Sequence, residues 1–546
     1  MDPAWREWCV LVATAGSAKL ELNGRHWARC VHPGRAGWPR GRVVPFLWRA
    51  ELYISAMHPG EHLKMAMVLQ DTVGVAAPWA LFPPKIRLQI LEVVLRQGGR
   101  GSCAAVCSEW KAFIEPQNFY RLELQVPCLE QLGHMATRTP GLVRQIRLNI
   151  ELPRYSCRSC QWPESRSRKS QHSSIFRAAI QKLFTVLSAW KPTGHLVLEL
   201  NTFSPSDSEH WFKNYCIGLD AQTDGESEQQ QQQEAPARWH DPKHGCIDGR
   251  QVESPSAYAM SRLFAPICLS LPESIPEVHA VTRLVIRREC RRQIIPPVLR
   301  LLLQKLPRLQ SMVYEPWRAC RRTWKIACDR VHVEMLSIFE DPNSELVSAM
   351  HRDPLFQHII DDNMTAGAEL VRALVLRSCD LKHLSISFMV DARQFLDSLQ
   401  STHCCYKLRS LTLTASILKR ESQSRRIASF LSDASWFPKE MKQLERLILW
   451  NSKRGEACAV IYQRDRSSQQ ATLMRRGTWH FELNYEVVES WKKVDPDFIL
   501  RIENEQLHAV IKQKGDSIYH LRLPGEVIDP ISAWQLRQEA FVGEEV

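Results

Sequence analysis

The 546-residue sequence has no apolar run of the roughly 18–20 residues needed to cross a bilayer, so we expect no membrane-spanning helix and no membrane partner. A signal peptide needs a positively charged segment before its apolar stretch. The short apolar stretch at residues 9–15 follows Arg6 and Glu7, whose charges cancel, so we expect no secretory signal. The phosphate-binding loop, the G-x-S-x-G nucleophile turn and the H-E-x-x-H zinc helix are also missing. We therefore expect a protein that is not an enzyme, with no catalytic residues, metal or cofactor.

A long block of like charge is missing too, although the formal net charge is +12. Arginines cluster locally at Arg287, Arg288, Arg291 and Arg292, and no zinc finger, RNA-recognition motif or basic zipper accompanies them. We expect these side chains on an exposed helix or loop face. Binding to nucleic acid stays an alternative that is supported by charge alone.

The 17 cysteines are scattered and odd in number, which does not fit the disulfide framework of a short secreted chain. We expect reduced, mostly buried thiols in a cytoplasmic or nuclear protein. Cys157 and Cys160 form a single C-x-x-C pair, whereas a structural zinc site needs four ligands, usually supplied by a second pair. We expect a flexible loop at this pair.

Histidines and an aspartate gather at His210, His240, Asp241 and His244. The four-residue spacing of His240 and His244 would suit two metal ligands on a helix, but Pro242 stands between them. The neighbouring aromatic residues favour packing around a buried polar turn. We expect neither a metal site nor catalysis here.

One pattern recurs along the chain, an apolar residue followed by x-x-L-x-L or a close variant. Several copies lie about 24–27 residues apart, within the roughly 20–29-residue period of leucine-rich repeats. Because side chains alternate between the faces of a strand, L-x-L places two apolar residues on one face. The copies end in the pairs Leu122/Leu124, Ile146/Leu148, Leu284/Ile286, Leu309/Met312, Leu336/Ile338, Leu384/Ile386, Leu411/Leu413, Leu447/Leu449 and Leu521/Leu523, with a related strand at residues 196–200.

Helices must cover such strands, and apolar stripes at helical spacing lie at residues 175–187, 298–306 and 395–399. The asparagine or cysteine that follows L-x-L in a regular repeat is mostly absent. We therefore expect an α/β fold, in which a short N-terminal helical module precedes an irregular leucine-rich-repeat-like array of strands and helices. Residues 457–462, 471–474 and 478–483 predict an antiparallel β segment near the C-terminal end.

Polar segments interrupt this organisation. Residues 1–77 show no helix or strand period, and we expect a poorly ordered extension there. Residues 154–174 and 220–238 are polar and low in complexity, so we expect surface insertions that cannot order themselves. The predicted domains are the extension at 1–77, a helical module at 78–124 and the array at 125–546.

The most specific motif lies in the helical module. The run Phe82-Pro83-Pro84-Lys85-Ile86 opens an amphipathic helix, because proline suits the first helical turn. A second short helix carries Val106 to Trp110, and an aromatic-x-Arg-Leu sequence follows at residues 119–122. These segments resemble the Leu-Pro-x-Glu-Ile, Val-Cys-x-x-Trp and trailing elements of an F-box. Phe82 replaces the family's leucine, and Lys85 replaces its acidic residue.

The resemblance extends over residues 80–540 to a family of uncharacterised F-box-like proteins of filamentous fungi. It is carried by residues 150–155, 204–211, 239–245, 314–317 and 476–479. An F-box implies docking on the Skp-type adaptor of a cullin-based ubiquitin ligase, with the repeats holding a target protein. The adaptor contacts that it implies are Phe82, Pro83, Ile86, Ile90, Val106, Cys107 and Trp110.

Three functions therefore remain open from the sequence. The first is an F-box-type substrate receptor, and the second is a repeat scaffold whose F-box-like helices no longer bind the adaptor. The third is a basic protein associated with nucleic acid.

Overall fold

The computed structural model describes residues 79, 82–97, 103–136, 141–191, 194–211, 240–247, 250–251, 253, 255–267, 271–317, 333–340, 367–400, 407–509, 511 and 514–538. The chain divides into two compact units, Met1–Tyr120 and Arg121–Val546. The predicted extension at 1–77 and the predicted insertion at 220–238 lie outside the described residues. Within the described part, no helix combines the length and apolar character needed to span a bilayer.

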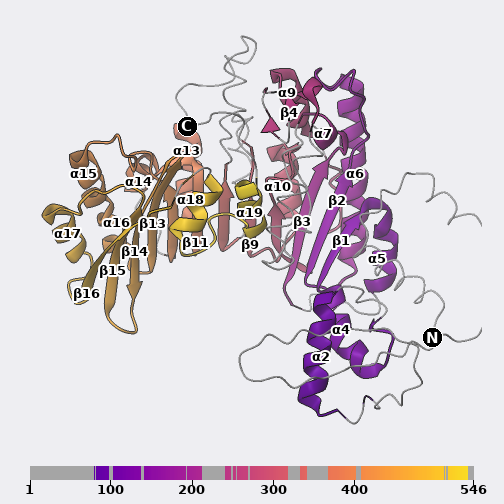
Figure 1. Ribbon diagram of the computed structural model, residues 1–546, viewed down its shortest axis with the longest axis horizontal. Coiled ribbons are helices and arrows are strands. Elements are labelled where there is room, and N and C mark those ends of the chain that lie inside the picture. The colour runs from indigo at the N-terminus through magenta and orange to yellow at the C-terminus, as the bar shows by residue number, and fades with distance from the viewer. Residues whose placement is uncertain are drawn as a thin grey trace, which may run out of the picture. The chain divides into compact units, whose positions relative to one another are not determined.

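The first unit contains the two predicted helices, α2 (Pro84–Gln97) and α4 (Ser108–Tyr120), shown in indigo in Figure 1. They enclose a small core of Leu91, Ala104 and Ile114. Helix α4 begins at Ser108, two residues after the start of the apolar pattern at Val106, because the Val106 amide closes a turn onto the carbonyl of Cys103 before the helix starts.

The second unit is built on one twelve-stranded, mostly parallel sheet, which confirms the mixed α/β class. The strands follow one another across the sheet in chain order. Neighbours are parallel from β1 to β13, antiparallel between β13, β14 and β15, and parallel again between β15 and β16. The strands are β1 (Arg121–Gln125), β2 (Gln145–Glu151), β3 (Leu196–Phe203), β7 (Val281–Ile286), β9 (Ser311–Tyr314), β10 (Met335–Phe339), β11 (His383–Asp391), β12 (Ser410–Thr414), β13 (Arg446–Lys453), β14 (Glu456–Asp465), β15 (Gln470–Gly477) and β16 (Ile499–Gln506).

One row of apolar side chains crosses the nine parallel strands from β1 to β13 in register. Each member is directly opposite the next and buried, because each copy of the pattern that forms a strand, and the related strand β3, places an apolar residue on the same face. The row consists of Leu122, Ile146, Leu198, Leu284, Met312, Leu336, Leu384, Leu411 and Leu447.

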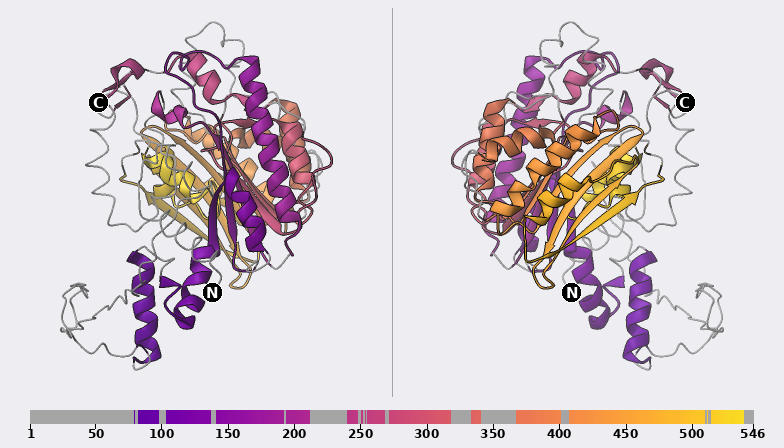
Figure 2. Two further views of the ribbon diagram at one scale, coloured as in Figure 1. Left: turned by 90° about the vertical axis from the view of Figure 1, so that its right-hand side faces the viewer. Right: turned by 90° about the vertical axis from the view of Figure 1, so that its left-hand side faces the viewer.

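Helices cover this face of the sheet, and two C-terminal helices lie on the opposite face (Figures 1 and 2). The three predicted apolar stripes coincide with α6, α10 and α14, and Leu306 follows two residues after the end of α10. Their apolar residues are buried except for Ile175 and Leu301, which are half-buried. The covering helices are α5 (Leu129–Ala136), α6 (Arg166–Ser188), α10 (Pro296–Gln304), α13 (Ala368–Ser378), α14 (Ala392–Gln400), α15 (Ser424–Ala434), α16 (Trp436–Glu440) and α17 (Tyr485–Lys492). The helices on the opposite face are α18 (Lys514–Leu521) and α19 (Pro530–Gln538).

Three sequence predictions about this unit are wrong. The last copy of the pattern, ending in Leu521 and Leu523, is not a strand, since Leu521 closes helix α18 and packs on the sheet. Residues 478–483 are not a strand either, and β16 takes the place beside β15. Residues 154–174 are ordered: the Ser165 hydroxyl caps α6 by accepting from the amide of Arg168 at 3.3 Å.

Cys379 is disulfide-bonded, which the expectation of reduced thiols did not foresee. The other eight cysteines of the described ranges are not in disulfides.

The predicted basic cluster is buried inside the second unit. Arg287, Arg288, Arg291 and Arg292 are each 2% exposed, so the expectation of an exposed basic face is wrong. Burying a guanidinium is unfavourable unless an acid pairs with it, and the acids come from distant segments.

Arg287 shows how such a pairing also docks α19. Its Nε donates to Glu199 Oε1 on β3 at 2.8 Å, and its Nη1 lies 3.7 Å from Asp529 Oδ1, just before α19. Glu315, after β9, accepts the amide of Asp529 at 2.6 Å and the hydroxyl of Ser532. These contacts join the C-terminal segment to the middle of the sheet.

We expect Leu411→Ala, in the centre of the apolar row, to lower the free energy of unfolding by about 2–5 kcal/mol, because the cavity is enclosed on both sides by neighbouring row residues. Urea unfolding followed by circular dichroism measures this change. Leu376→Ala on α13, whose side chain is 56% exposed, is the control and should change the value by less than about 0.5 kcal/mol. Equal effects of the two substitutions would contradict the row as the core.

We expect the stability of the second unit to fall as the pH rises from about 4.5 toward about 8. Burial, and then the neighbouring charge of Asp529, raise the pKa of Glu315 to about 8, so the folded protein holds a proton that the unfolded chain releases near its ordinary value of 4.5. This contribution is complete below 4.5 and is lost as the pH approaches 8, with a slope of up to about 1.4 kcal/mol per pH unit.

Glu315→Gln should flatten this pH dependence. The substitution can also change the free energy of unfolding by an amount that does not depend on pH, and this leaves the slope unaffected. Urea titrations at several pH values between 5 and 8 measure the slope for both proteins. Glu482→Gln, at an exposed position, should keep the wild-type slope. A wild-type slope in Glu315→Gln would show that Glu315 does not hold the proton.

Candidate functional site

The seven predicted adaptor contacts fall into an exposed group and a packed group. Val106 is 61% exposed, and Pro83 and Cys107 are exposed as well. Phe82 and Ile86 are half-buried, so part of each side chain reaches the surface. The exposed and half-buried residues lie at the start of α2 and in the turn before α4.

Ile90 and Trp110 belong to the packed group. Ile90 is 8% exposed, and Trp110 packs against the core of Leu91, Ala104 and Ile114. The ring of Trp110 lies 5.3 Å from that of Trp79, measured between centroids. These two predicted contacts therefore hold the helices together.

A short polar network fixes the start of α4. Trp79 Nε1 donates to Glu109 Oε2 at 2.7 Å, and Arg87 Nε of α2 lies 3.4 Å from Glu109 Oε1. Glu109 lies in the first turn of α4, where a negative charge is favourable. Leu88, which the sequence analysis did not single out, adds a 45% exposed apolar side chain on α2.

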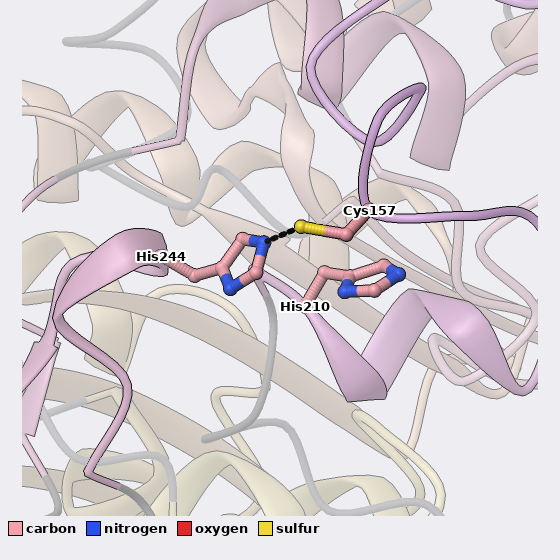
Figure 3. A group of neighbouring side chains, drawn as sticks. All are labelled: Cys157, His210 and His244. Atoms are coloured by element: carbon pink, nitrogen blue, oxygen red, sulfur yellow. Dashed lines mark hydrogen bonds between the residues drawn. The ribbon is translucent and has the colours of Figure 1, made fainter.

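A second candidate site lies in the other unit, where Cys157, His210 and His244 come together (Figure 3). One ligand atom from each lies within 4.8 Å of the other two. Cys157 Sγ is 3.2 Å from His244 Nε2, and Cys160 Sγ is 3.5 Å from the same nitrogen. Cys160 is outside the group whose ligand atoms all lie within 4.8 Å of one another, and it adjoins that group at His244.

Three separate segments position these side chains. The cysteines lie in a turn after β2, where the Cys160 amide donates to the Cys157 carbonyl at 3.4 Å. His210 follows α7 (Ser206–Glu209), a short helix after β3. His244 ends the 3-10 turn η6 (Pro242–His244), and Gly245 follows with a φ of 65°. A Cβ at Gly245 would lie 2.6 Å from Glu253 Cβ, so glycine is needed there.

Polar partners orient both imidazoles. His244 Nδ1 lies 2.7 Å from Asp241 Oδ2, so Nδ1 carries the proton and Nε2 presents its lone pair toward the two sulfurs. His210 Nε2 lies 3.4 Å from the Tyr155 carbonyl, which accepts its proton and leaves the lone pair on Nδ1.

The surroundings of this cluster are largely apolar. Cys160 and Trp211 belong to a buried group with Met260 and Phe264, and the ring of Trp211 meets that of His244 edge-on at 5.4 Å. Burial, with the nearby Cys157, raises the pKa of the Cys160 thiol.

Lys243 brings a positive charge to the rim of the cluster. A hydrogen bond with Cys157 and the charge of that sulfur raise the pKa of the exposed Lys243 ammonium.

Sequence alone offers no reason to join the C-x-x-C pair to the histidines, and it predicted a flexible loop at the cysteines. The structure instead brings Cys157 next to His210 and His244. The parallel register of β2 and β3 brings the two loops to the same edge of the sheet. Of the four-residue histidine group, only His210 and His244 reach the cysteines, and Asp241 orients His244.

Residues 330–529 match the sequence profile of a family described as a family of unknown function (DUF6546). The match spans less than half of the chain and covers the second half of the sheet, from β10 to β16, with α18. A search of curated proteins finds no match.

Proposed function

We propose that the chain is a non-catalytic, F-box-type substrate receptor that links a target protein to a Skp/cullin ubiquitin ligase in the cytoplasm or nucleus. The observation that carries this proposal is the exposure of Val106, Cys107 and Pro83 at the positions that the F-box resemblance assigns to the adaptor. Apolar side chains at a helix start, held by a packed core beneath them, suit binding to a groove of a partner.

The architecture of the second unit supports a role in binding the target protein. Its parallel strands lie in chain order with helices on one face, which is the arrangement of a strand–helix repeat array. We propose that this leucine-rich-repeat-like array presents the target. Its opposite face carries α18 and α19, so the target would meet the remaining surface.

The structure sharpens the choice of variant for testing the adaptor contact. Trp110 would be a poor choice, because its removal would disturb the core of the module. Val106→Asp places a charge at a surface position and leaves that core intact.

We expect purified full-length protein to retain a purified Skp-type adaptor in a pull-down, and Val106→Asp to reduce the retained adaptor at least about tenfold, since a charge would be buried in an apolar contact. Leu376→Asp, at an exposed apolar position of α13, is the matched control and should bind as the wild type does. Circular dichroism confirms that all three proteins are folded.

Failure of the folded wild type to bind the adaptor would overturn the receptor proposal. The alternative would then be a repeat scaffold with F-box-like helices that no longer bind, and the exposed Lys85 in place of an acidic residue favours this alternative.

The nucleic-acid alternative is weakened by the burial of Arg287, Arg288, Arg291 and Arg292, whose guanidinium groups do not face solvent. Binding through phosphate contacts would fall steeply with salt, and the same preparations can be tested for it.

A further inference from the structure

Two sulfur–nitrogen distances in the cysteine–histidine cluster are close to those of a tetrahedral metal site. Zinc bonds of about 2.3 Å to sulfur and about 2.0–2.1 Å to nitrogen, at tetrahedral angles, place a sulfur and a nitrogen ligand roughly 3.6 Å apart. The two sulfur–nitrogen distances to His244 are 3.2 and 3.5 Å. Both sulfur–nitrogen distances to His244 are therefore close to the tetrahedral value. The Cys160 thiol, which donates to the Cys157 carbonyl at 3.0 Å, has to turn toward the other three ligands to complete the site.

The donor set also identifies the metal. Two thiolates with two imidazoles are the set of many structural zinc sites, whereas calcium and magnesium prefer oxygen ligands. The carboxylate of Asp241 behind His244 is the orienting partner that metal-bound histidines usually have.

We propose that Cys157, Cys160, His210 and His244 bind one zinc ion, and that this ion fastens together the loop after β2, the loop after β3 and the turn η6. Four protein ligands leave no open position for water or substrate, so the site is structural and not catalytic. The burial of Cys160 and His244, at 3% and 4% exposure, agrees with a closed site.

The position of the site explains what the ion would stabilise. The loops after β2 and β3 lie beyond the apolar row, where Tyr155 and Trp211 pack in a separate buried group and the Tyr155 hydroxyl donates to Asp207 at 3.1 Å. One ion would link Cys157 to His210, 53 positions away in sequence, and to His244, 87 positions away. Such links also restrict the conformations of the unfolded chain.

The first test is the metal content of the full-length protein, purified through a tag without histidines and without chelators, after expression with added zinc. Elemental analysis should find close to one zinc per chain. Cys157→Ser and His244→Ala should each lower the zinc content at least about tenfold, because loss of one of four ligands weakens a structural site strongly. The matched controls Cys128→Ser, at a half-buried position, and His195→Ala, at an exposed one, should keep the wild-type content.

Asp241→Asn tests the orienting contact separately. It keeps all four ligands, and competition with a fluorescent chelator should show zinc affinity about 10–100-fold weaker than in the wild type. Unchanged affinity would contradict the assignment of His244 as a ligand.

The absorption spectrum of bound Co²⁺ tests the metal site even if the serine and alanine variants do not fold. Replacing zinc by Co²⁺ in the wild type should give the visible bands of a tetrahedral centre and a thiolate charge-transfer band. Cys157→His, which exchanges one ligand for another, should still bind one metal ion but with about half of the charge-transfer intensity, since one of two thiolates is gone.

Two results would overturn the proposal. One is folded wild-type protein that takes up neither zinc nor cobalt. The other is zinc that persists in full in folded Cys157→Ser and His244→Ala, which would place the ion elsewhere in the chain. Neither result bears on adaptor binding, which is read from the other unit.

Discussion

The second unit depends on one constraint, the burial of an apolar row that runs in register across nine parallel strands, from Leu122 to Leu447. A parallel sheet must be covered on both faces, because its crossover helices lie against it and its strands have no solvated side. Each strand buries its row residue only when the next strand and a covering helix are in place. Stability is therefore shared between neighbouring repeats, and a defect in one strand weakens the two beside it.

The opposite face of the sheet creates a second requirement, because its residues differ along the array. Near β13 and β14 this face is apolar, with Ile448 and Ile461 packed under the C-terminal segment. On β2 and β3 it carries Arg147 and Glu199, which are buried and paired. The C-terminal segment packs on both the apolar and the charged parts of this face. Its apolar residues contact β13 and β14, and Asp529, Ser532 and Gln535 contact the buried charged side chains.

Features with a local period could be predicted from the sequence, and features that depend on distant partners could not. The L-x-L pattern predicted most strands of the sheet, and the apolar stripes predicted α6, α10 and α14. The same pattern failed at Leu521, because a segment that lies across the sheet buries leucine just as a strand does. The arginines from Arg287 to Arg292 were expected at the surface, because acids such as Glu164 and Glu199 are far away in sequence. In the first unit, the motif marked the right helices but could not separate the exposed Val106 from the packed Trp110.

The cysteine–histidine cluster shows the same limit of sequence prediction and also how it could be overcome. A C-x-x-C pair supplies two ligands, and sequence alone gives no reason to join it to histidines 53 and 87 residues away. The register of the sheet gives that reason, because Cys157 lies six residues after the end of β2 and His210 seven residues after the end of β3. Parallel neighbours end at the same edge, so similar offsets from their ends bring the two loops together. Once strand register is known, ligand motifs in adjacent loops can be tested as one site, as we propose for Cys157, Cys160, His210 and His244, although the sequence alone predicted a flexible loop at the cysteines.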